Sequence, residues 1–226
     1  MNRLKNEWKR YWDTRVKNNQ PYFGMNKRNS DKIIQILAID KKDRVLDIGC
    51  ATGGHLSDIR NKTEAKCYGI DISPVPIKLN KDKKIKLKVA SMLNMPYKPD
   101  VFTKIFALGT VEHSPETEEI FREINRVASI GGKIFITVPN KASFFHLTKN
   151  LKIFLGRWDL GYEKSFTKGE ILRALNKTGF KLDKFWVEPH QSVANIFNFL
   201  DNFLNKVNNK RFGFFIYFTA SKIKNV

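Results

Sequence analysis

The feature that most constrains the fold is a regular alternation of short apolar runs with segments of helical character. The apolar runs have the length of strands and lie at residues 44–48, 66–72, 85–90, 102–108 and 133–138. The helical segments between them are expected at 54–61, from Ser73 onward, and at 115–129. Because the connections are short, this order favours parallel strands joined by helical crossovers. The sequence therefore predicts an α/β fold built on a doubly wound, mostly parallel sheet.

Further elements are expected on both sides of the alternating region. They are a helix over about 4–17, a helix capped by Ser30 or Asp31, a helix at 167–177, a strand at 181–187, a helix at about 193–205 and a strand at 212–219. The pair Gly131-Gly132 is expected to end the 115–129 helix, since glycine commonly follows the last helical turn.

The chain has 226 residues, of which 42% are hydrophobic. This is enough to bury the core of one domain with an appendage. The predicted parts are an N-terminal basic and aromatic arm at 1–29 over the active site and a main domain at 30–226, with helical insertions at about 141–165 and 190–210.

Basic residues outnumber acidic ones, 41 to 22, so the formal net charge is +19. An excess of this size indicates an anionic partner, either nucleic acid or an anionic membrane surface. The lysines are dispersed along the chain, however, and a generally lysine-rich surface explains the same number equally well. The charge therefore leaves both interpretations open.

Cysteine and histidine usage bears on compartment and metals. Cys50 and Cys67 lie in apolar, strand-like stretches, so no disulfide framework is expected and a reducing compartment fits. The four histidines are scattered without metal-ligand spacing, which argues against a structural zinc site. The first ten residues are charged and no run is apolar enough for a membrane span. We expect a soluble cytoplasmic protein, with a peripheral position at a membrane surface as the alternative.

The junction after the first expected strand reads Val-Leu-Asp-Ile-Gly-Cys-Ala-Thr-Gly-Gly at residues 45–54. Glycines at such a junction let the backbone approach a ligand, and the helix start offers unpaired N–H groups. Asp71 closes the second strand, 18 residues after Gly53. Its carboxylate can accept two hydrogen bonds from a ribose diol across the crevice. Together these features predict an adenosine site.

The spacing of the glycines separates two cofactor classes. The dinucleotide pattern G-x-G-x-x-G is absent, because the glycines are Gly49, Gly53 and Gly54. An acid before the first glycine, as D-x-G-x-x-x-G, runs instead from Asp47 to Gly53. Here the chain resembles class I S-adenosylmethionine-dependent methyltransferases, among them quinone-biosynthesis and other small-molecule enzymes. The ordered set VLDIGCATGG, YGIDIS, NMPY, GTVEH and GGKIFITVPN carries this resemblance.

The resemblance implies a Rossmann-like, seven-stranded sheet with an antiparallel last strand, and S-adenosyl-L-methionine as methyl donor. The cofactor-binding residues that it implies are Asp47, Gly49, Cys50, Ala51, Gly53, Asp71, Ile72, Ser91, Met92 and Leu108. In the family, Asp47 and the glycines line the methionine half of the cofactor, Asp71 holds the ribose hydroxyls and Ile72 packs on the adenine.

The chain departs from the family pattern at two of these positions. Ala51 stands where a glycine is usual. Ser91 stands where an acid often binds the adenine amino group, and its hydroxyl can form a weaker hydrogen bond while Met92 packs on the ring.

The fourth expected strand runs into the stretch 109–113, which includes Glu112 and His113. Methyl transfer from a sulfonium is an in-line displacement, so the protein aligns the nucleophile and can remove its proton. His113 has the ordinary pKa of a general base. The alternative is that Glu112 and His113 organise the loop and the helix after it. Gly109 stands where metal-binding relatives carry an acid, so no metal is expected.

Aromatic residues in the flanking segments, together with Thr110, are expected on the acceptor side. They are Trp8, Tyr11, Trp12, Tyr22, Trp158 and Tyr162. They predict a small or lipid-like acceptor. One alternative is an RNA methyltransferase that uses the basic surface, including the lysines at 81–88, although the Asn-Pro-Pro-Tyr type tetrapeptide of base-amino methylating relatives is absent. A second alternative is a non-catalytic S-adenosylmethionine-binding partner subunit.

Overall fold

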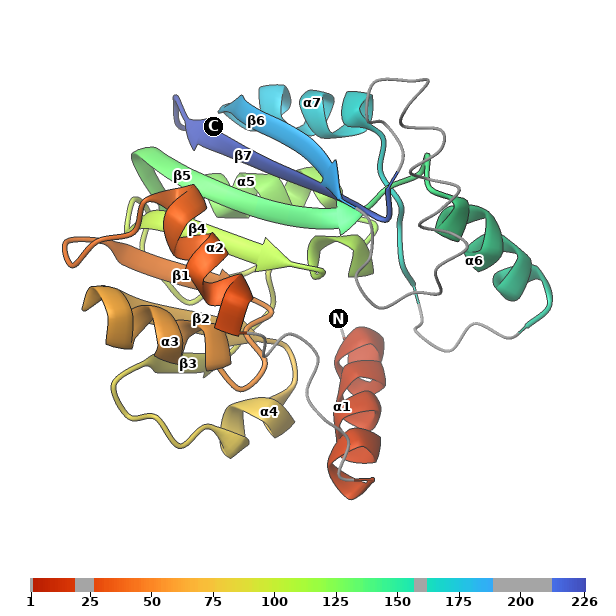
Figure 1. The fold of residues 1–226 in the computed structure, drawn as a ribbon, viewed down its shortest axis with the longest axis horizontal. Helices are drawn as coiled ribbons and strands as arrows, with labels where there is room; N and C mark the ends of the chain where they lie inside the picture. Colours follow the sequence, from red (N-terminus) through yellow and green to blue (C-terminus); the bar gives the residue numbers. More distant parts are fainter. Residues whose placement is uncertain (1, 19–26, 157–161, 189–212) are drawn as a thin grey trace.

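The structure is a computed structural model and describes residues 2–18, 27–156, 162–188 and 213–226. In these ranges seven strands form one sheet in the order β3-β2-β1-β4-β5-β7-β6 (Figure 1). The strands are β1 (Arg44–Ile48), β2 (Lys66–Asp71), β3 (Lys86–Val89), β4 (Phe102–Leu108), β5 (Ala128–Pro139), β6 (Phe180–Glu188) and β7 (Phe215–Lys222). The helices are α1 (Asn2–Lys17), α2 (Lys27–Leu37), α3 (Gly54–Thr63), α4 (Pro74–Leu79), α5 (Thr117–Val127), α6 (Phe144–Phe154), α7 (Lys168–Lys177) and the short 3-10 helix η1 (Val111–His113).

Strand direction confirms the predicted architecture. The five strands from β3 to β5 pair in parallel, with β1 at the centre between β2 and β4. The last strand, β7, is antiparallel to both β5 and β6. All the expected strands are present, although β5 begins at Ala128 rather than at Lys133. The carboxyl ends of the parallel strands therefore meet at one edge of the sheet, which we call the carboxyl edge.

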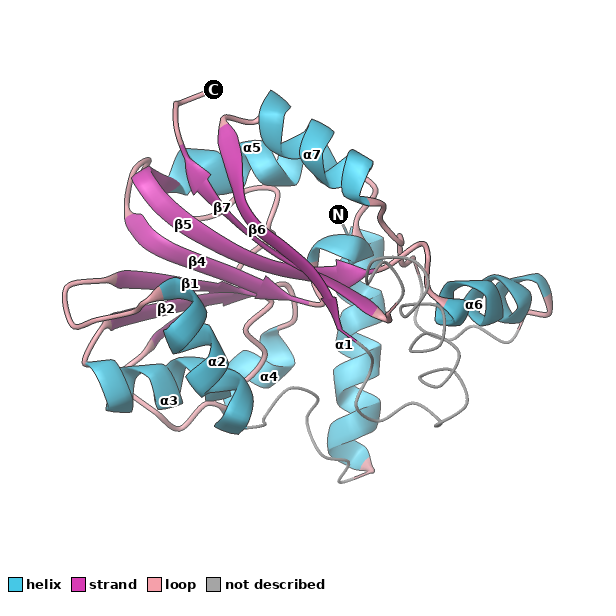
Figure 2. Cartoon of the chain, turned by 45° about the horizontal axis from the view of Figure 1, so that its top comes forward, coloured by secondary structure: helices cyan, strands magenta, loops and turns pink. Residues whose placement is uncertain are grey.

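Helices cover both faces of the sheet, as Figure 2 shows. Successive side chains of a strand point to opposite faces, so Val45 packs with α2 and α3 whereas Leu46 packs with α5 and α7. In β5, Phe135 joins the first layer and Ile134 the second. The sheet is thus buried on both faces, which explains the apolar runs in the sequence.

The start of β5 corrects one prediction. Helix α5 ends at Val127 and the chain passes directly into β5. Gly131 and Gly132 lie inside this strand, so the expectation that they end the helix is wrong. Gly131 has a φ of 74°, a left-handed conformation that glycine adopts without strain. The two glycines therefore belong to an irregular first part of β5 and do not cap the helix.

The start of α2 corrects a second prediction. This helix begins at Lys27, so Ser30 lies inside it and neither Ser30 nor Asp31 is its cap. The buried Ser30 hydroxyl donates to Asp58 Oδ2 at 3.1 Å and lies 3.0 Å from His55 Nδ1. A residue type that favours caps here connects α2 to α3.

Two helices lie beyond the carboxyl edge (Figure 1). One is α1, which matches the helix expected at 4–17 and contacts α4. The other is α6, in the first expected insertion, which projects away from the sheet (Figures 1 and 2). The second expected insertion and its helix at 193–205 lie outside the described residues. No helix in the described ranges has both the length and the apolarity to cross a membrane.

Candidate active site

The turn after β1 requires glycine at two positions. Gly49 and Gly53 have φ values of 80° and 79°, and Gly53 is the N-cap of α3. A Cβ on Gly49 would lie only 2.3 Å from Thr110 Oγ1. Thr110, expected on the acceptor side, therefore stands directly against the glycine turn. The backbone N–H groups of the first turn of α3 follow this loop and form a positive end for an anionic group.

Two buried aspartates flank the turn. The side chains of Asp47 and Asp71 come from neighbouring strands at the carboxyl edge. Asp71 accepts hydrogen bonds from the backbone N–H of Ala51 at 3.0 Å and of Ser73 at 2.8 Å. Burial raises the pKa of Asp71, and these two bonds oppose the increase. Burial, followed by the nearby charge of Asp71, raises the pKa of Asp47 well above its usual value.

The other implied cofactor residues lie at the same edge of the sheet. Cys50 is buried, and burial raises the pKa of its thiol well above the usual value, which makes it a packing residue. Ala51 takes a φ of 48° at the position where the family usually has glycine. Ile72 and Leu108 are half-buried at the ends of β2 and β4.

The turn after β3 carries Ser91 and Met92, the two residues expected beside the adenine. The Ser91 hydroxyl accepts a hydrogen bond from the backbone N–H of Leu93 at 3.2 Å, and Met92 packs against the main core. This turn is joined to β2 because Ala90 N–H donates to Asp71 O at 2.9 Å. Ser91 thus supports a turn, while its hydroxyl oxygen keeps a further lone pair.

Glu112 is a buried acid beside the end of β4. Its residue is 2% exposed, and within the described residues its Oε2 atom has no hydrogen-bond partner. Burial raises the pKa of Glu112 to about 8, with a smaller contribution from the charge of Glu163. At pH 7 this carboxyl is therefore mainly protonated.

His113 follows Glu112 in η1 and is held on two sides. Its Nδ1 atom lies 3.1 Å from the carbonyl oxygen of Tyr162, and its ring packs edge-to-face on Trp8 with centroids 4.7 Å apart. A carbonyl oxygen only accepts, so this contact places the hydrogen on Nδ1 and leaves the lone pair on Nε2. Burial lowers the pKa of His113, against the Tyr162 contact and Glu163.

The aromatic residues of the flanking segments divide into two groups. Trp8, Tyr11 and Trp12 form a chain of edge-to-face contacts on α1, in which Trp12 is buried. Tyr162 lies on the segment that contacts His113 and its residue is 47% exposed. The positions of Tyr22 and Trp158 lie outside the described residues.

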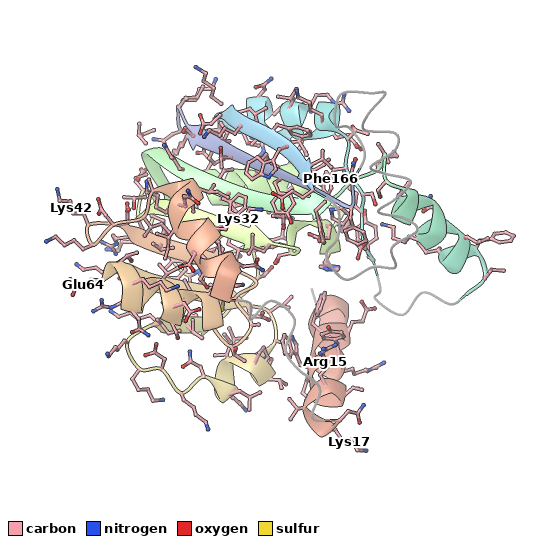
Figure 3. All side chains as sticks on the ribbon, viewed as in Figure 1. Arg15, Lys17, Lys32, Lys42, Glu64 and Phe166 are labelled. Carbon is pink, nitrogen blue, oxygen red and sulfur yellow. The ribbon has the colours of Figure 1, made fainter. Side chains whose placement is uncertain are left out.

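The structure adds residues that the sequence did not single out. Thr137 accepts from the Gly109 N–H through its hydroxyl at 3.1 Å, which connects the end of β4 to β5. Lys149 of α6 is buried beside the 162–166 segment. Phe166 ends this segment beside the end of β5, where it accepts from Lys141 N–H and donates to Pro139 O (Figure 3). A lysine in a basic helix carries no sequence signal of burial, so reasoning from the sequence missed it.

Two further observations delimit the site. Among the described residues, no group of three or more His, Cys, Asp or Glu residues is arranged to hold a metal. An open hollow of about 680 Å³ lies between α2 and β1 and at the end of α3, where Lys41 and Thr63 line it. This is the edge of the sheet opposite the carboxyl edge, so the hollow is separate from the site.

The donor set fits an S-adenosylmethionine-like ligand. A Cβ would crowd the turn at Gly49, and two buried carboxyls lie at the ends of β1 and β2, close to the start of α3. Carboxylates suit a ribose diol and a cationic sulfonium, and a helix start suits a carboxylate. The fold and site thus define an adenosine-binding domain of the class I methyltransferase type.

Comparison with known proteins gives the family. The profile described as a methyltransferase domain matches residues 39–180. The chain therefore belongs to this family of class I S-adenosylmethionine-dependent methyltransferase domains, and the predicted resemblance is confirmed. S-adenosyl-L-methionine is the methyl donor typical of the family.

Two relatives illustrate the range of similar proteins. The chain is 33% identical to ajmaline N-methyltransferase of Rauvolfia serpentina over 106 residues, which is 43% of this chain and 36% of the relative. It is 33% identical to chloroplastic tocopherol O-methyltransferase of Arabidopsis thaliana over 104 residues, 42% of this chain and 30% of the relative. The chain thus spans about a third of the length of these curated relatives.

A solved structure shares the fold. Geranyl diphosphate C-methyltransferase from Streptomyces coelicolor A3(2) superposes with a TM-score of 0.62 and 15% identity, over 87% of this chain and 79% of that chain. This likeness shows the architecture alone, because the identity is low.

Proposed function

We propose that the protein transfers a methyl group from S-adenosylmethionine to a small-molecule acceptor. The observation that carries the proposal is the pair of buried aspartates, Asp47 and Asp71, at the glycine turn of a methyltransferase domain. Relatives named as alkaloid and tocopherol methyltransferases support a small acceptor for this chain.

When bound, S-adenosylmethionine supplies a methyl group that its sulfonium already activates. Asp71 then has the role of holding the ribose hydroxyls, because its two N–H bonds favour the ionised carboxylate against the effect of burial while lone pairs remain. The start of α3 stabilises the carboxylate of the methionine half. Asp47, the second buried carboxyl at the turn, would line the methionine half of the donor.

His113 is the general base in this proposal. Its Nε2 lone pair takes the proton of the acceptor heteroatom as that atom forms its bond to the methyl carbon and the carbon–sulfur bond breaks. Because burial lowers the pKa of His113, the imidazole is neutral at pH 7 and ready to accept a proton. Glu112, mainly protonated at pH 7, supports η1 from within.

The donor site is tested by calorimetry with S-adenosylhomocysteine. A charge-assisted hydrogen bond is worth about 1.5–3 kcal/mol, so Asp71→Ala is expected to weaken binding roughly ten- to a hundred-fold. The matched control is Asp183→Ala, at an exposed aspartate of β6 that bonds Ser221 far from the site. Equal affinity in both variants would contradict the assignment of Asp71.

The chemistry is tested by methyl transfer from radiolabelled S-adenosylmethionine into a small-molecule fraction of cell extract. His113→Gln is expected to lower turnover while leaving affinity for S-adenosylhomocysteine intact, because the ring acts on the acceptor. Full turnover in the variant would remove the base assignment. Label found only in an RNA fraction would support the RNA alternative instead.

We infer that the acceptor site lies between the N-terminal arm and the 141–165 insertion. Support comes from Trp8 on His113 and from the place of α1 and α6 beyond the carboxyl edge (Figure 1). The division into an arm at 1–29 and a main domain at 30–226 is part of the same proposal, and α2, which begins at Lys27, spans this boundary. A partly aromatic boundary suits a hydrophobic acceptor.

We also propose contact with an anionic membrane surface. The end of α6 exposes four apolar residues, of which Phe154 is 86% exposed, and the chain carries a net charge of +19. The exposed residues are Leu151, Ile153, Phe154 and Leu155. Exposed apolar side chains on a basic protein suit an anionic bilayer. The lysines of β3 give less support to RNA, because the ammonium groups of Lys86 and Lys88 lie over tyrosine rings.

Vesicle flotation tests this contact. Binding to anionic phosphatidylglycerol vesicles is expected, with none to neutral phosphatidylcholine, and Phe154→Ser is expected to weaken it about ten-fold through lost apolar burial. The control is Ile130→Ser, an exposed apolar residue at the opposite edge of the sheet. No binding, or equal binding by both variants, would refute the proposal.

A further inference from the structure

Lys149 is a buried cation beside the proposed site. Its side chain is 2% exposed, although it belongs to α6, the helix that projects from the sheet. Its Nζ atom donates to the carbonyl oxygen of Glu163 at 3.0 Å, to Glu163 Oε1 at 3.2 Å and to Ser165 Oγ at 2.8 Å. A lysine is rarely buried unless it is paired, and these contacts use the three donors of the ammonium group.

The partners of Lys149 belong to an extended segment, residues 162–166, that runs between α6 and η1. On the η1 side, Lys164 N–H donates to Glu112 O at 2.9 Å, and Tyr162 O contacts His113 Nδ1 at 3.1 Å. On the α6 side, Ser165 Oγ lies 3.0 Å from His146 Nδ1 in addition to its contact with Lys149. The segment is therefore held on one side by Lys149 and holds η1 with its other side.

The consequence concerns the tautomer of His113. The Tyr162 carbonyl selects the form with hydrogen on Nδ1, provided that the backbone of the segment stays in place. Glu163, whose carbonyl and carboxylate both bind Lys149, is the next residue after Tyr162. Fixing Glu163 restricts the peptide unit whose oxygen orients the imidazole.

We propose that Lys149 is a positioning residue, which fixes the 162–166 segment so that Tyr162 holds His113 in the tautomer with a free Nε2. The catalytic role of this arrangement rests on the proposed function. The control of a histidine tautomer by a lysine through a backbone carbonyl does not depend on any methyl acceptor. Lys149 acts through Tyr162 and does not contact His113 in the contacts described above.

The charged groups around His113 give the proposal a second measurable consequence, a change in the pKa of His113. The 162–166 segment contributes the Glu163 carboxylate and α6 contributes the Lys149 ammonium, while α1 contributes the neutral ring of Trp8. Glu112, the neighbour of His113 in η1, is mainly protonated at pH 7. Lys149 opposes protonation of His113 and Glu163 favours it. Removing the lysine is therefore expected to raise the pKa of His113, and neutralising Glu163 to lower it.

The direct test is long-range proton–nitrogen NMR on histidine-labelled protein, with His113 assigned by His113→Gln. The wild type is expected to show one neutral tautomer with hydrogen on Nδ1. In Lys149→Met the two ring nitrogens are expected to average between tautomers, and the titration midpoint of His113 is expected to rise. Lys149→Arg is expected to retain the midpoint because the charge remains.

Two further variants complete the design. Glu163→Gln is expected to lower the His113 midpoint, and Lys222→Met, at another buried lysine far from the site, is expected to leave both the tautomer and the midpoint unchanged. If Lys149→Met does not fold, Ser165→Ala removes one of the acceptors of Lys149 and is expected to mix the tautomers to a smaller extent.

The outcomes separate this proposal from the proposed function. An unchanged His113 tautomer and midpoint in folded Lys149→Met would overturn the positioning role. Where turnover can be measured, Lys149→Met is expected to lower kcat about ten-fold, with unchanged affinity for S-adenosylhomocysteine. If His113 has a mixed tautomer in Lys149→Met but the wild type transfers no methyl group, the positioning role would be supported and the proposed function refuted.

Discussion

The two edges of the sheet bury charged groups in opposite ways. At the edge opposite the site, the Lys222 side chain is 0% exposed and its ammonium group donates to Asp100 Oδ1, Asn125 O and Ala128 O at 2.7–2.8 Å. At the carboxyl edge, Asp47 lies beside Asp71, and an oxygen of Glu112 has no partner among the described residues. At the first edge, hydrogen bonds and an ion pair compensate the buried charge of Lys222. At the carboxyl edge, burial raises the pKa values of the acids.

The difference between the two edges indicates that buried groups at one edge stabilise the fold and that those at the other edge belong to the proposed site. The Lys222 contacts join the end of α5 to β5 and β7, and no residue of the proposed site takes part. Lys149 has the same chemistry, a buried ammonium with three acceptors, but its acceptors lie on the segment that contacts His113. Buried ionisable groups with perturbed pKa values gather at functional sites, and here the carboxyl edge fits that rule.

The largest expected effect is on the free energy of unfolding and concerns Glu112, a buried acid at the carboxyl edge. Its pKa is about 8 in the folded protein and near the usual 4.5 in the unfolded chain. Its contribution to stability is therefore fully present below about pH 4.5 and is lost as the pH rises through 8. Glu112→Gln mimics the neutral acid, so it is expected to match the wild type at pH 4 and to exceed its free energy of unfolding by about 4 kcal/mol at pH 9.

Urea denaturation from pH 4 to pH 9 measures this difference. The control is Glu118→Gln on α5. Glu118 is an exposed acid paired with Lys177, and this hydrogen bond lowers the pKa of Glu118. The control variant is not expected to gain stability at high pH. Parallel pH curves for Glu112→Gln and the wild type would show that Glu112 ionises normally.

A somewhat smaller effect is expected at the opposite edge. Lys222→Met leaves the carbonyls of Asn125 and Ala128 without their donor, which is expected to lower the free energy of unfolding by about 3 kcal/mol. Affinity for S-adenosylhomocysteine in the folded protein is expected to remain unchanged. Denaturation and calorimetry check the two halves of this prediction, and a large loss of affinity would break the comparison between the edges.

The smallest expected effect concerns Asp47. Because burial and Asp71 raise the pKa of Asp47, its ionisation destabilises the fold as the pH rises through that raised pKa. Asp47→Asn is expected to increase the Tm of the ligand-free protein at pH 7 by about 2–4 °C, and this gain should vanish at low pH. The same variant is expected to bind S-adenosylhomocysteine more weakly. A lower Tm would mean that Asp47 is stabilising as an anion.

The alternation of strands and helices could be predicted because each element carries its own pattern. Strand β1 is buried from Val45 to Ile48 and mainly apolar, and α5 has apolar residues at helical spacing. The glycine turn and Asp71 were visible because a ligand crevice needs these residue types at one junction. Predictions failed where one residue type serves two purposes, as for Ser30, which ties α2 to α3, and Gly131, which lies in a strand.

By itself, the sequence determined the layered sheet, and it predicted the residues of a methyl-donor site and the candidate pair Glu112 and His113. These depend on local periodicity and on residues close together along the chain. Only the tertiary structure decided which ionisable groups are buried together, since Lys149 reaches the segment that carries Tyr162, and Tyr162 reaches η1, through folding and not through sequence spacing. A pKa and a tautomer depend on desolvation and on partners in space, and no linear pattern encodes them.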